Sequence, residues 1–229
     1  MAGLFITGTD TGVGKTQVTL AFMRLLQQRG YRVIGMKPVA TGCVWVNGEL
    51  RNEDALQFQA QSSVQLRYVE INPYAFEPAI SPHIAAELAG REISLQCLVG
   101  QCRSLQAKAD CVLVEGVGGW LVPLSKREKL ADLAHELALP VVLVVGMRLG
   151  CLNHALLTFR SLIDSQVSLA GWVANLCEPG FEYLEENIST LKHCLSLPYL
   201  GSLPYSESGG NLTGLNGLDA DEILRRADV

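Results

Sequence analysis

With 229 residues, of which 48% are hydrophobic and 18% charged, the chain has the size and composition of one α/β domain rather than of a disordered or fibrous protein. Its formal net charge of -5 disfavours a broad basic surface, so we expect no nucleic-acid partner. No apolar run approaches the roughly 18 residues of a membrane span, the first residues lack a secretory signal, and the cysteines contain no CxxC pair. We therefore expect a cytoplasmic protein with reduced thiols and no membrane partner.

Short apolar runs alternate with helical patterns along the chain. Strands are expected at residues 4–6, 31–36, 110–115, 140–146, 169–175 and 199–203. A helix is expected after the first strand, because Val18, Phe22 and Leu25 recur at helical spacing, and Gly30 is placed to end it. Further helical patterns lie at about 53–61, 82–90, 94–108, 129–138, 152–165 and 181–194. This alternation predicts an α/β fold with a mostly parallel sheet and helices on both faces, in one domain over residues 1–229.

The first predicted strand runs into a glycine-rich loop, Gly8-Thr-Asp-Thr-Gly-Val-Gly-Lys15-Thr16. In a phosphate-binding loop, glycines let backbone N–H groups face the phosphate, a Lys reaches the β- and γ-phosphates, and a Thr hydroxyl binds Mg²⁺. Five residues rather than the usual four separate Gly8 from Gly14, and the alternative is a glycine-rich turn with an incidental Lys-Thr pair. We expect a P-loop NTPase-like fold that binds ATP and Mg²⁺. The loop alone does not separate a ligase from a kinase or a switch ATPase.

Three charged side chains are candidates for the same site, because ligands of open parallel sheets bind where the strands end. Glu115 ends a predicted strand and can hold Mg²⁺, the alternative being a solvated strand-end Glu. Asp54 opens a predicted helix, so helix stabilisation explains it as well as metal binding does. Lys37 follows the second strand. Beside Lys15 it suits an intermediate with extra negative charge, such as a carbamate or an acyl phosphate, although a solvated lysine is the alternative.

Nine segments carry a resemblance to a known family: Thr7-Gly-Thr-Asp-Thr-Gly-Val-Gly-Lys-Thr16, Gly35-Met-Lys-Pro-Val-Ala-Thr-Gly42, Arg51-Asn-Glu-Asp-Ala55, Asn72-Pro-Tyr74, Ser81-Pro-His83, Val112-Leu-Val-Glu-Gly-Val-Gly-Gly-Trp120, Pro140-Val-Val-Leu-Val-Val-Gly146, Leu149-Gly-Cys-Leu-Asn-His-Ala155 and Leu169-Ala-Gly-Trp-Val-Ala-Asn175. In this order they resemble dethiobiotin synthetase over nearly the whole chain. The five-residue spacing in the P-loop is the one that this family carries.

The resemblance implies a reaction and its substrates. 7,8-Diaminononanoate takes up CO₂ on one amine to give a carbamate, which attacks the γ-phosphoryl group of ATP and forms a carbamic–phosphoric anhydride. The second amine then attacks the carbonyl carbon, expels phosphate and closes the ureido ring of dethiobiotin. Such an enzyme is an ATP-dependent cyclo-ligase of biotin biosynthesis.

The resemblance also implies roles for individual residues. The catalytic side chains would be Thr11, Lys15 and Lys37, and the substrate would be contacted by Thr11, Lys37 and Thr41. Mg²⁺ would be held by Thr16, Asp54 and Glu115. ATP would be bound by Gly12, Val13, Gly14, Lys15, Thr16 and Gln17, by Asp54, by Glu115, Gly116, Val117 and Gly118, and at its base by Asn175, Pro204, Tyr205, Ser206 and Asn211.

A homodimer is implied as well. In the family the loop formed here by Gly150, Cys151, Leu152 and Asn153 reaches the carboxylate of the partner's substrate. Two residues depart from the family pattern, and both concern the nucleotide. Gly12 stands where some relatives carry an acidic residue, and Asn211 stands where a Glu is expected near the adenine. Nucleotide selectivity is therefore left open, as is the question whether Cys151 packs or responds to redox conditions.

Three other functions share parts of this pattern. A switch-type ATPase of the partitioning or cell-division-placement kind would carry a second lysine early in the loop, where this chain has Asp10. An amide ligase of the cobyrinate type would normally be fused to a glutaminase domain, for which 229 residues leave no room. A non-catalytic nucleotide-binding module has no need for Lys15, Lys37, Asp54 and Glu115 together.

Overall fold

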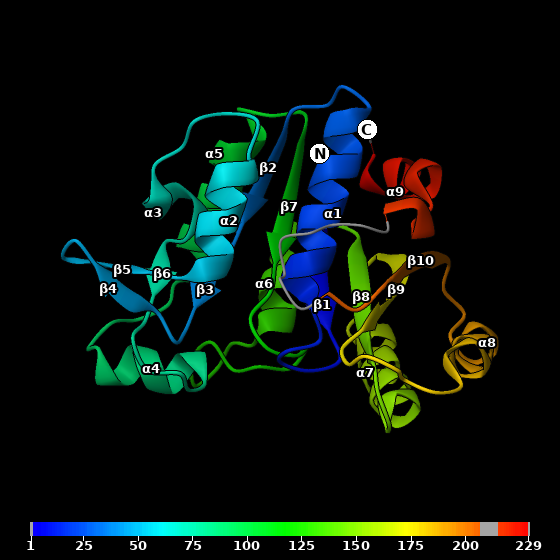
Figure 1. Cartoon of the computed structure of the whole chain (residues 1–229). Coiled ribbons are helices and arrows are strands. Elements are labelled where there is room, and N and C mark those ends of the chain that lie inside the picture. Colours follow the sequence, from blue (N-terminus) through cyan, green and yellow to red (C-terminus); the bar gives the residue numbers. More distant parts are fainter. Residues whose placement is uncertain (1, 207–214, 229) are drawn as a thin grey trace.

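The centre of the protein is a six-stranded parallel sheet. The computed structural model describes residues 2–206 and 215–228. The strands are β1 (Gly3–Gly8), β2 (Val33–Met36), β7 (Cys111–Glu115), β8 (Val141–Met147), β9 (Leu169–Leu176) and β10 (Tyr199–Leu203). They lie side by side in the order β10-β9-β8-β1-β7-β2, and every neighbouring pair is parallel (Figure 1). All six strands therefore end at the same edge of the sheet.

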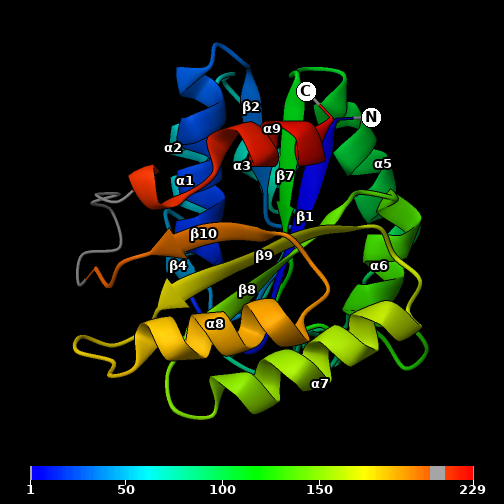
Figure 2. The same cartoon turned by 90° about the vertical axis from the view of Figure 1, so that its right-hand side faces the viewer.

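Helices cover both faces of the sheet. One face carries α1 (Lys15–Gln28), α2 (Glu53–Gln61) and α9 (Ala220–Ala227). The opposite face carries α5 (Leu95–Gln106), α6 (Leu130–Leu137), α7 (Cys151–Asp164) and α8 (Leu184–Cys194), as the turned view shows (Figure 2). This arrangement confirms the predicted α/β fold with a parallel sheet between two helical layers.

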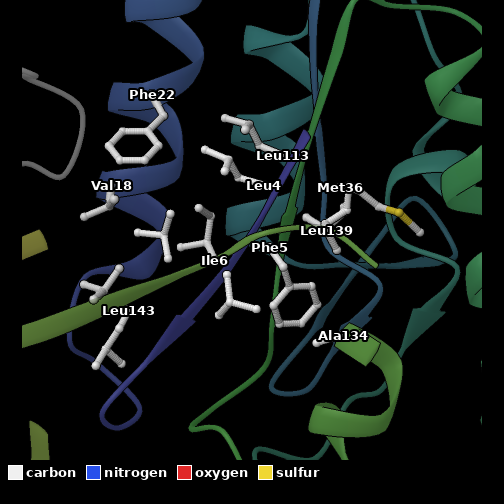
Figure 3. Close-up of a cluster of buried hydrophobic side chains, with 14 of the residues drawn as sticks. Leu4, Phe5, Ile6, Val18, Phe22, Met36, Leu113, Ala134, Leu139 and Leu143 are labelled. Carbon is white, nitrogen blue, oxygen red and sulfur yellow. The ribbon is translucent and has the colours of Figure 1, made fainter. Parts of the chain in front are cut away.

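The hydrophobic core fills the space between the sheet and both helical layers. On β1, Leu4 and Ile6 face α1, where they meet Val18 and Phe22, while Phe5 points to the other side near α6 (Figure 3). All five of these side chains are fully buried. A strand that is apolar on both faces is what a central parallel strand requires, since each face is covered by helices.

Smaller elements surround the carboxyl edge of β2. An antiparallel hairpin joins β4 (Val44–Val46) to β5 (Glu49–Arg51), and β3 (Val39–Ala40) pairs with β6 (Tyr74–Ala75). The short helices there are α3 (Tyr68–Ile71) and α4 (Pro82–Leu88), whereas the 3₁₀ turn η1 (Leu215–Gly217) lies beside β10. Among the described residues, no helix combines the length and the apolar character needed to cross a membrane.

The six predicted strands and seven predicted helices are all present, with shifted ends. The second strand begins at Val33 rather than Tyr31, because the Tyr31 N–H bonds to the last turn of α1. The last predicted helix, 181–194, begins at Leu184, since Tyr183 takes a left-handed conformation with φ of 57°. Four strands (β3, β4, β5, β6) and two α-helices (α3, α9) within the described residues were not predicted.

Candidate functional site

A cavity of about 410 Å³ opens where β1, β2 and β7 end. The three strands are neighbours, so the segments that follow them converge: the P-loop after β1, Lys37 after β2, and the glycine-rich turn after β7. The first turn of α2 closes the remaining side. The predicted residues that line the cavity are Thr11, Gly12, Gly14, Lys15, Thr16, Gln17, Lys37, Thr41, Asp54, Glu115, Val117 and Gly118.

Backbone geometry in the P-loop depends on glycine. Gly14 precedes the first residue of α1 with φ of 83°, in the left-handed region. A Cβ at Gly14 would lie 2.0 Å from the Asn175 Nδ2 atom, so a side chain would collide as well as strain the backbone. Gly12 has φ of 73° but faces open space. The loop thus has free N–H groups at the start of a helix, which is the arrangement that binds phosphate.

Glu115 is the fully buried carboxylate at the centre of the site. It ends β7, where it pairs in register with Ile6 of β1, and none of its surface is exposed. The Thr16 hydroxyl donates to its Oε1 atom at 3.1 Å and the Thr19 hydroxyl donates to its Oε2 atom at 3.0 Å. Both threonines lie on the first turns of α1, so hydrogen bonds from this helix fix the carboxylate that ends β7.

Lys37 joins the two carboxylates that the sequence suggested as metal ligands. Its ammonium group donates to Glu115 Oε1 at 2.5 Å and to Asp54 Oδ2 at 2.8 Å. Burial alone would lower the pKa of Lys37, but the two carboxylates outweigh this and raise the pKa above its usual value. For Asp54, burial works in the opposite direction, yet Lys37 lowers its pKa below the usual value. The three groups therefore form a charged cluster.

Lys15 provides a second ammonium group in the same small volume. It is 7% exposed, and its Nζ atom donates to the Asp10 carbonyl at 2.8 Å. Burial lowers the pKa of Lys15 to about 8, against the attraction of Glu115. Lys37 contributes to the same lowering, since two nearby cations disfavour each other. An anion of high charge entering the cavity would relieve this repulsion.

The side chains around Glu115 fit a magnesium ion that is completed by phosphate oxygens. Among the described residues, no three His, Cys, Asp or Glu side chains gather to enclose a metal. Glu115, Asp54 and the Thr16 hydroxyl do converge, and Lys37 already neutralises the two carboxylates as a cation would. Mg²⁺ prefers such a set, one or two carboxylates with phosphates and water, to a closed protein cage.

Asn175 lies behind the P-loop, at the end of β9 next to β8. Its Nδ2 atom donates to the Val13 carbonyl at 3.0 Å. Its Oδ1 atom is buried without a hydrogen-bond partner among the described residues. A buried acceptor of this kind is costly unless a donor reaches it, and the exocyclic amine of adenine is such a donor. Pro204, Tyr205 and Ser206 follow β10 beyond the neighbouring strand, whereas Asn211 lies outside the described residues.

The Gly150–Asn153 segment lies at the start of α7, and none of its residues is among those that line the cavity. Gly150 precedes the helix with φ of 93°, and Leu149 beside it is 95% exposed. Cys151 is 2% exposed and its thiol lies 3.8 Å from Asn187 Oδ1, so it packs between α7 and α8. The cavity and this segment are therefore separate features of one subunit.

Several residues of the site were missed in the sequence. Thr19 holds Glu115, and Asp10 anchors Lys15 through its carbonyl. Asp10 also forms an ion pair with Arg148, which follows β8, at 2.9 Å. Thr19 lies one helical turn after Lys15, and that spacing was a signal that it shares the same face of α1. No sequence pattern indicated the contact between Arg148 and Asp10, because the two partners are 138 positions apart.

Comparison with known proteins places the chain among P-loop proteins. The profile of a family described as "AAA domain" matches residues 2–212. The chain is 51% identical to ATP-dependent dethiobiotin synthetase BioD of Cellvibrio japonicus, over 87% of this chain and 88% of that protein. It is 48% identical to the protein of the same name from Pseudomonas paraeruginosa, over 92% of each chain. The corresponding protein of Xylella fastidiosa is 46% identical, over 92% of this chain and 93% of that one.

Solved structures with the same fold are more distant. The septum site-determining protein MinD of Pyrococcus horikoshii, solved with Mg-ADP, superposes with a TM-score of 0.56 at 16% identity, over 97% of this chain and 88% of that one. A ParA family ATPase from Chlorobium tepidum gives a TM-score of 0.57 at 12% identity, over 98% of this chain and 92% of that one. At these identities the likeness concerns the fold alone.

Proposed function

Because the chain belongs to the family of ATP-dependent dethiobiotin synthetases, we propose that the cavity described above closes the ureido ring of dethiobiotin with ATP. The enzyme is a cyclo-ligase of biotin biosynthesis whose substrates are 7,8-diaminononanoate, CO₂ and ATP. The observation that carries the proposal is the pair of buried ammonium groups, Lys15 and Lys37, above two carboxylates in one cavity. Hydrolysis of ATP requires one such lysine, whereas a carbamate beside three phosphates suits two.

Each of the two lysines neutralises a different negatively charged group during the reaction. One amine of the diamine attacks the carbon of CO₂ and loses a proton, which gives the carbamate. A carbamate oxygen then attacks the γ-phosphorus, and the bond from that phosphorus to the ADP oxygen breaks. Lys37 binds the carbamate, and Lys15 follows the phosphoryl group during transfer. Fixed positive groups at the place where charge develops lower the barrier, and orientation contributes the rest.

Ring closure follows from the anhydride. The second amine attacks the carbonyl carbon, the bond from that carbon to the phosphate oxygen breaks, and phosphate leaves while the amine loses its proton. Thr11 and Thr41, which both line the cavity, bind the diamine. Placing both amines near the same carbon makes the second attack intramolecular, which favours a five-membered ring.

Mg²⁺ and ATP occupy the rest of the site. Thr16, Asp54 and Glu115 would hold Mg²⁺, which would neutralise the phosphates as a Lewis acid. The backbone from Gly12 to Gln17 binds the phosphates, together with Asp54 and the turn Glu115, Gly116, Val117 and Gly118. The unpartnered Asn175 Oδ1 atom supports a role in adenine recognition, with Pro204, Tyr205 and Ser206 beside it.

We also propose a homodimer. Leu149, Leu156, Leu157 and Ile163 expose between 40% and 95% of their surfaces along one helix, α7, and at its start. Apolar residues grouped in this way favour contact with a partner. A second copy covering α7 would bring Gly150, Cys151, Leu152 and Asn153 to the partner's substrate. Elements from both ends of the chain, β1 and α9 among them, pack on the six-stranded sheet, which supports treating residues 1–229 as one domain. Seven free thiols suit a cytoplasmic enzyme.

The proposal is tested by phosphate release from ATP with and without 7,8-diaminononanoate and bicarbonate. We expect release that requires the diamine, together with a product heavier by one carbonyl in the mass spectrum. The variant Lys37→Gln, which lacks one of the two ammonium groups, serves as the negative control. Release that is the same without the diamine would contradict the ligase function and would favour a switch ATPase.

A further inference from the structure

A hydrogen-bonded chain of two buried side chains ties Lys37 to the start of α2. The Asn52 N–H donates to Tyr68 Oη at 2.7 Å, and the Tyr68 hydroxyl donates to Asn72 Oδ1 at 2.8 Å. Asn72 Nδ2 donates in turn to the Lys37 carbonyl at 2.7 Å. Tyr68 is 8% exposed and Asn72 is 2% exposed, so water does not compete for these bonds.

This series of hydrogen bonds ends at the backbone of Lys37 on one side and at the helix turn that carries Asp54 on the other. Asn52 is the N-cap of α2, where its side chain accepts from the Ala55 N–H at 3.2 Å, and Asp54 lies in the first turn. The Lys37 N–H donates to the Ile71 carbonyl at 2.9 Å, so the short helix α3 holds the Lys37 backbone on both sides. Tyr68 and Asn72 therefore fix the distance between an ammonium group and its carboxylate.

We propose that Tyr68 and Asn72 are positioning residues for the Lys37–Asp54 pair, and through Asp54 for the magnesium ion. Neither residue lines the cavity, so neither touches ATP or the diamine directly. The side-chain polar atoms of both residues form hydrogen bonds within the protein, since Asn72 Nδ2 also donates to the Tyr74 carbonyl at 3.2 Å. The proposal rests on the proposed function for what Mg²⁺ serves, but its own test measures metal affinity rather than ring closure.

The packing around Tyr68 restricts its ring. The guanidinium group of Arg51 lies 4.2 Å from the ring centre on one face. With the ring in this position, the phenol oxygen accepts from Asn52 and donates to Asn72. Tyr68→Phe removes only the oxygen and leaves the Asn52 N–H and the Asn72 Oδ1 atom without their partner, while the ring and its packing remain.

The experiment is Mg²⁺ titration of the ADP complex by calorimetry, in the wild type and in Tyr68→Phe. Tyr68→Phe removes two buried hydrogen bonds, and we expect it to weaken Mg²⁺ binding by about tenfold, with ADP affinity in the absence of Mg²⁺ unchanged. Tyr74→Phe is the matched control. Tyr74 is equally buried, at 8% exposed, but its hydroxyl accepts from the Ser94 N–H, away from Lys37, so Mg²⁺ affinity should not change.

A double-mutant cycle with Asp54→Asn shows whether Tyr68 acts through Asp54. In the Asp54→Asn background, Tyr68→Phe should have less than a twofold further effect on Mg²⁺ affinity, because coupled residues are not additive. Equal losses in both backgrounds, or a fall in ADP affinity without Mg²⁺, would overturn the proposal. Failure of the diamine-dependent phosphate release would instead contradict the proposed function and leave this result standing.

Discussion

Lys37 has one role in the free protein and would have a second in the proposed reaction. In the free protein its ammonium group occupies the place between Asp54 and Glu115, and the same carboxylates are the proposed magnesium ligands. In the proposed reaction, a metal held by these carboxylates would leave the ammonium group free to turn toward a carbamate. Under this proposal a single residue neutralises two carboxylates before the nucleotide binds and contacts the substrate afterwards.

This gives a first prediction at the residue scale. Lys37→Gln should abolish ring closure while ATP binding stays within a few-fold of the wild type, because the phosphate contacts belong to the P-loop. ATP affinity is measured by calorimetry and turnover by product formation. An ATP affinity that falls as far as turnover would show that Lys37 serves the nucleotide and not the carbamate.

The same substitution has a second expected effect, on stability. Without Lys37, Glu115 is a fully buried carboxylate with no cation beside it. Removing one partner of a buried pair costs about 3 kcal/mol of the free energy of unfolding. Mg²⁺ should restore part of this loss, so thermal unfolding of Lys37→Gln should respond to Mg²⁺ more strongly than that of the wild type. Equal Mg²⁺ responses would contradict the shared place of ammonium and metal.

At the scale of a single element, hydrogen bonds to the Glu70 carboxylate stabilise helix α3. The Lys108 ammonium group bonds to Glu70 at 2.5 Å and the Arg67 N–H bonds to it at 2.9 Å. These bonds lower the pKa of Glu70 to about 2. A carboxyl whose pKa is lower in the folded state stabilises the fold above its unfolded pKa and ceases to do so as the pH falls toward the folded value. The stabilisation is therefore present at neutral pH and is lost between the ordinary Glu pKa and about 2.

We expect Glu70→Gln to lower the free energy of unfolding by about 1 kcal/mol at neutral pH, a figure reduced for solvent screening. The difference from the wild type should shrink as the pH falls below about 4. Urea unfolding at a series of pH values measures it. Glu87→Gln is the matched control, since that carboxylate is exposed and lies 3.9 Å from Lys126. A difference that does not change with pH would show that packing, not charge, holds Glu70.

Most elements could be predicted from the sequence, because the strands are continuous apolar runs and the helices have clear spacing. The missed strands β3 and β6 have two residues each and pair across 35 positions of sequence, which no local pattern reveals. The hairpin β4–β5 did have a local signal, Asn47-Gly48 between short strands. Helix α9 also had one: the Asp219 side chain accepts from the Glu222 N–H, the first half of a capping box.

The site could be predicted where a residue ends a strand or belongs to a motif. The P-loop, Lys37 and Glu115 are of this kind, and the structure brings them to one cavity. Asn72 stands in a segment that carries the family resemblance, but no pattern there predicts its contact with Lys37, 35 positions away. The contact of Tyr68 with Asn52, 16 positions away, had no signal either. Spacing along one helix or strand is visible in a sequence, whereas hydrogen bonds between loops depend on the finished fold.

At the scale of the whole molecule, the exposed side of α7 is the proposed contact between two subunits. Leu157 is 64% exposed on this helix. Leu157→Asp should shift the protein to monomers, because a carboxylate buried between two subunits costs more than the contact contributes. Sedimentation measures the change. Val69→Asp, on α3 at the other side of the molecule (Figure 1), is the matched control, as Val69 is 52% exposed.

The rate of ring closure by the Leu157→Asp variant is measured alongside its sedimentation. If the segment 150–153 binds the partner's substrate, the monomer should lose ring closure while it still binds ATP through its own P-loop. A Leu157→Asp monomer with full activity would contradict a shared site. A dimer that persists in Leu157→Asp would place the interface elsewhere.

The parallel register of the sheet has a consequence for altering this enzyme. Side chains alternate along a strand, so one residue inserted into β7 would turn Glu115 toward the opposite helical layer and away from Thr16. The turns at the other edge, such as 107–110 and 165–168, lie at the far ends of the strands and carry none of the site. They are the places to insert a peptide tag or a fluorescent label, since chain added there leaves the spacing of every strand end unchanged.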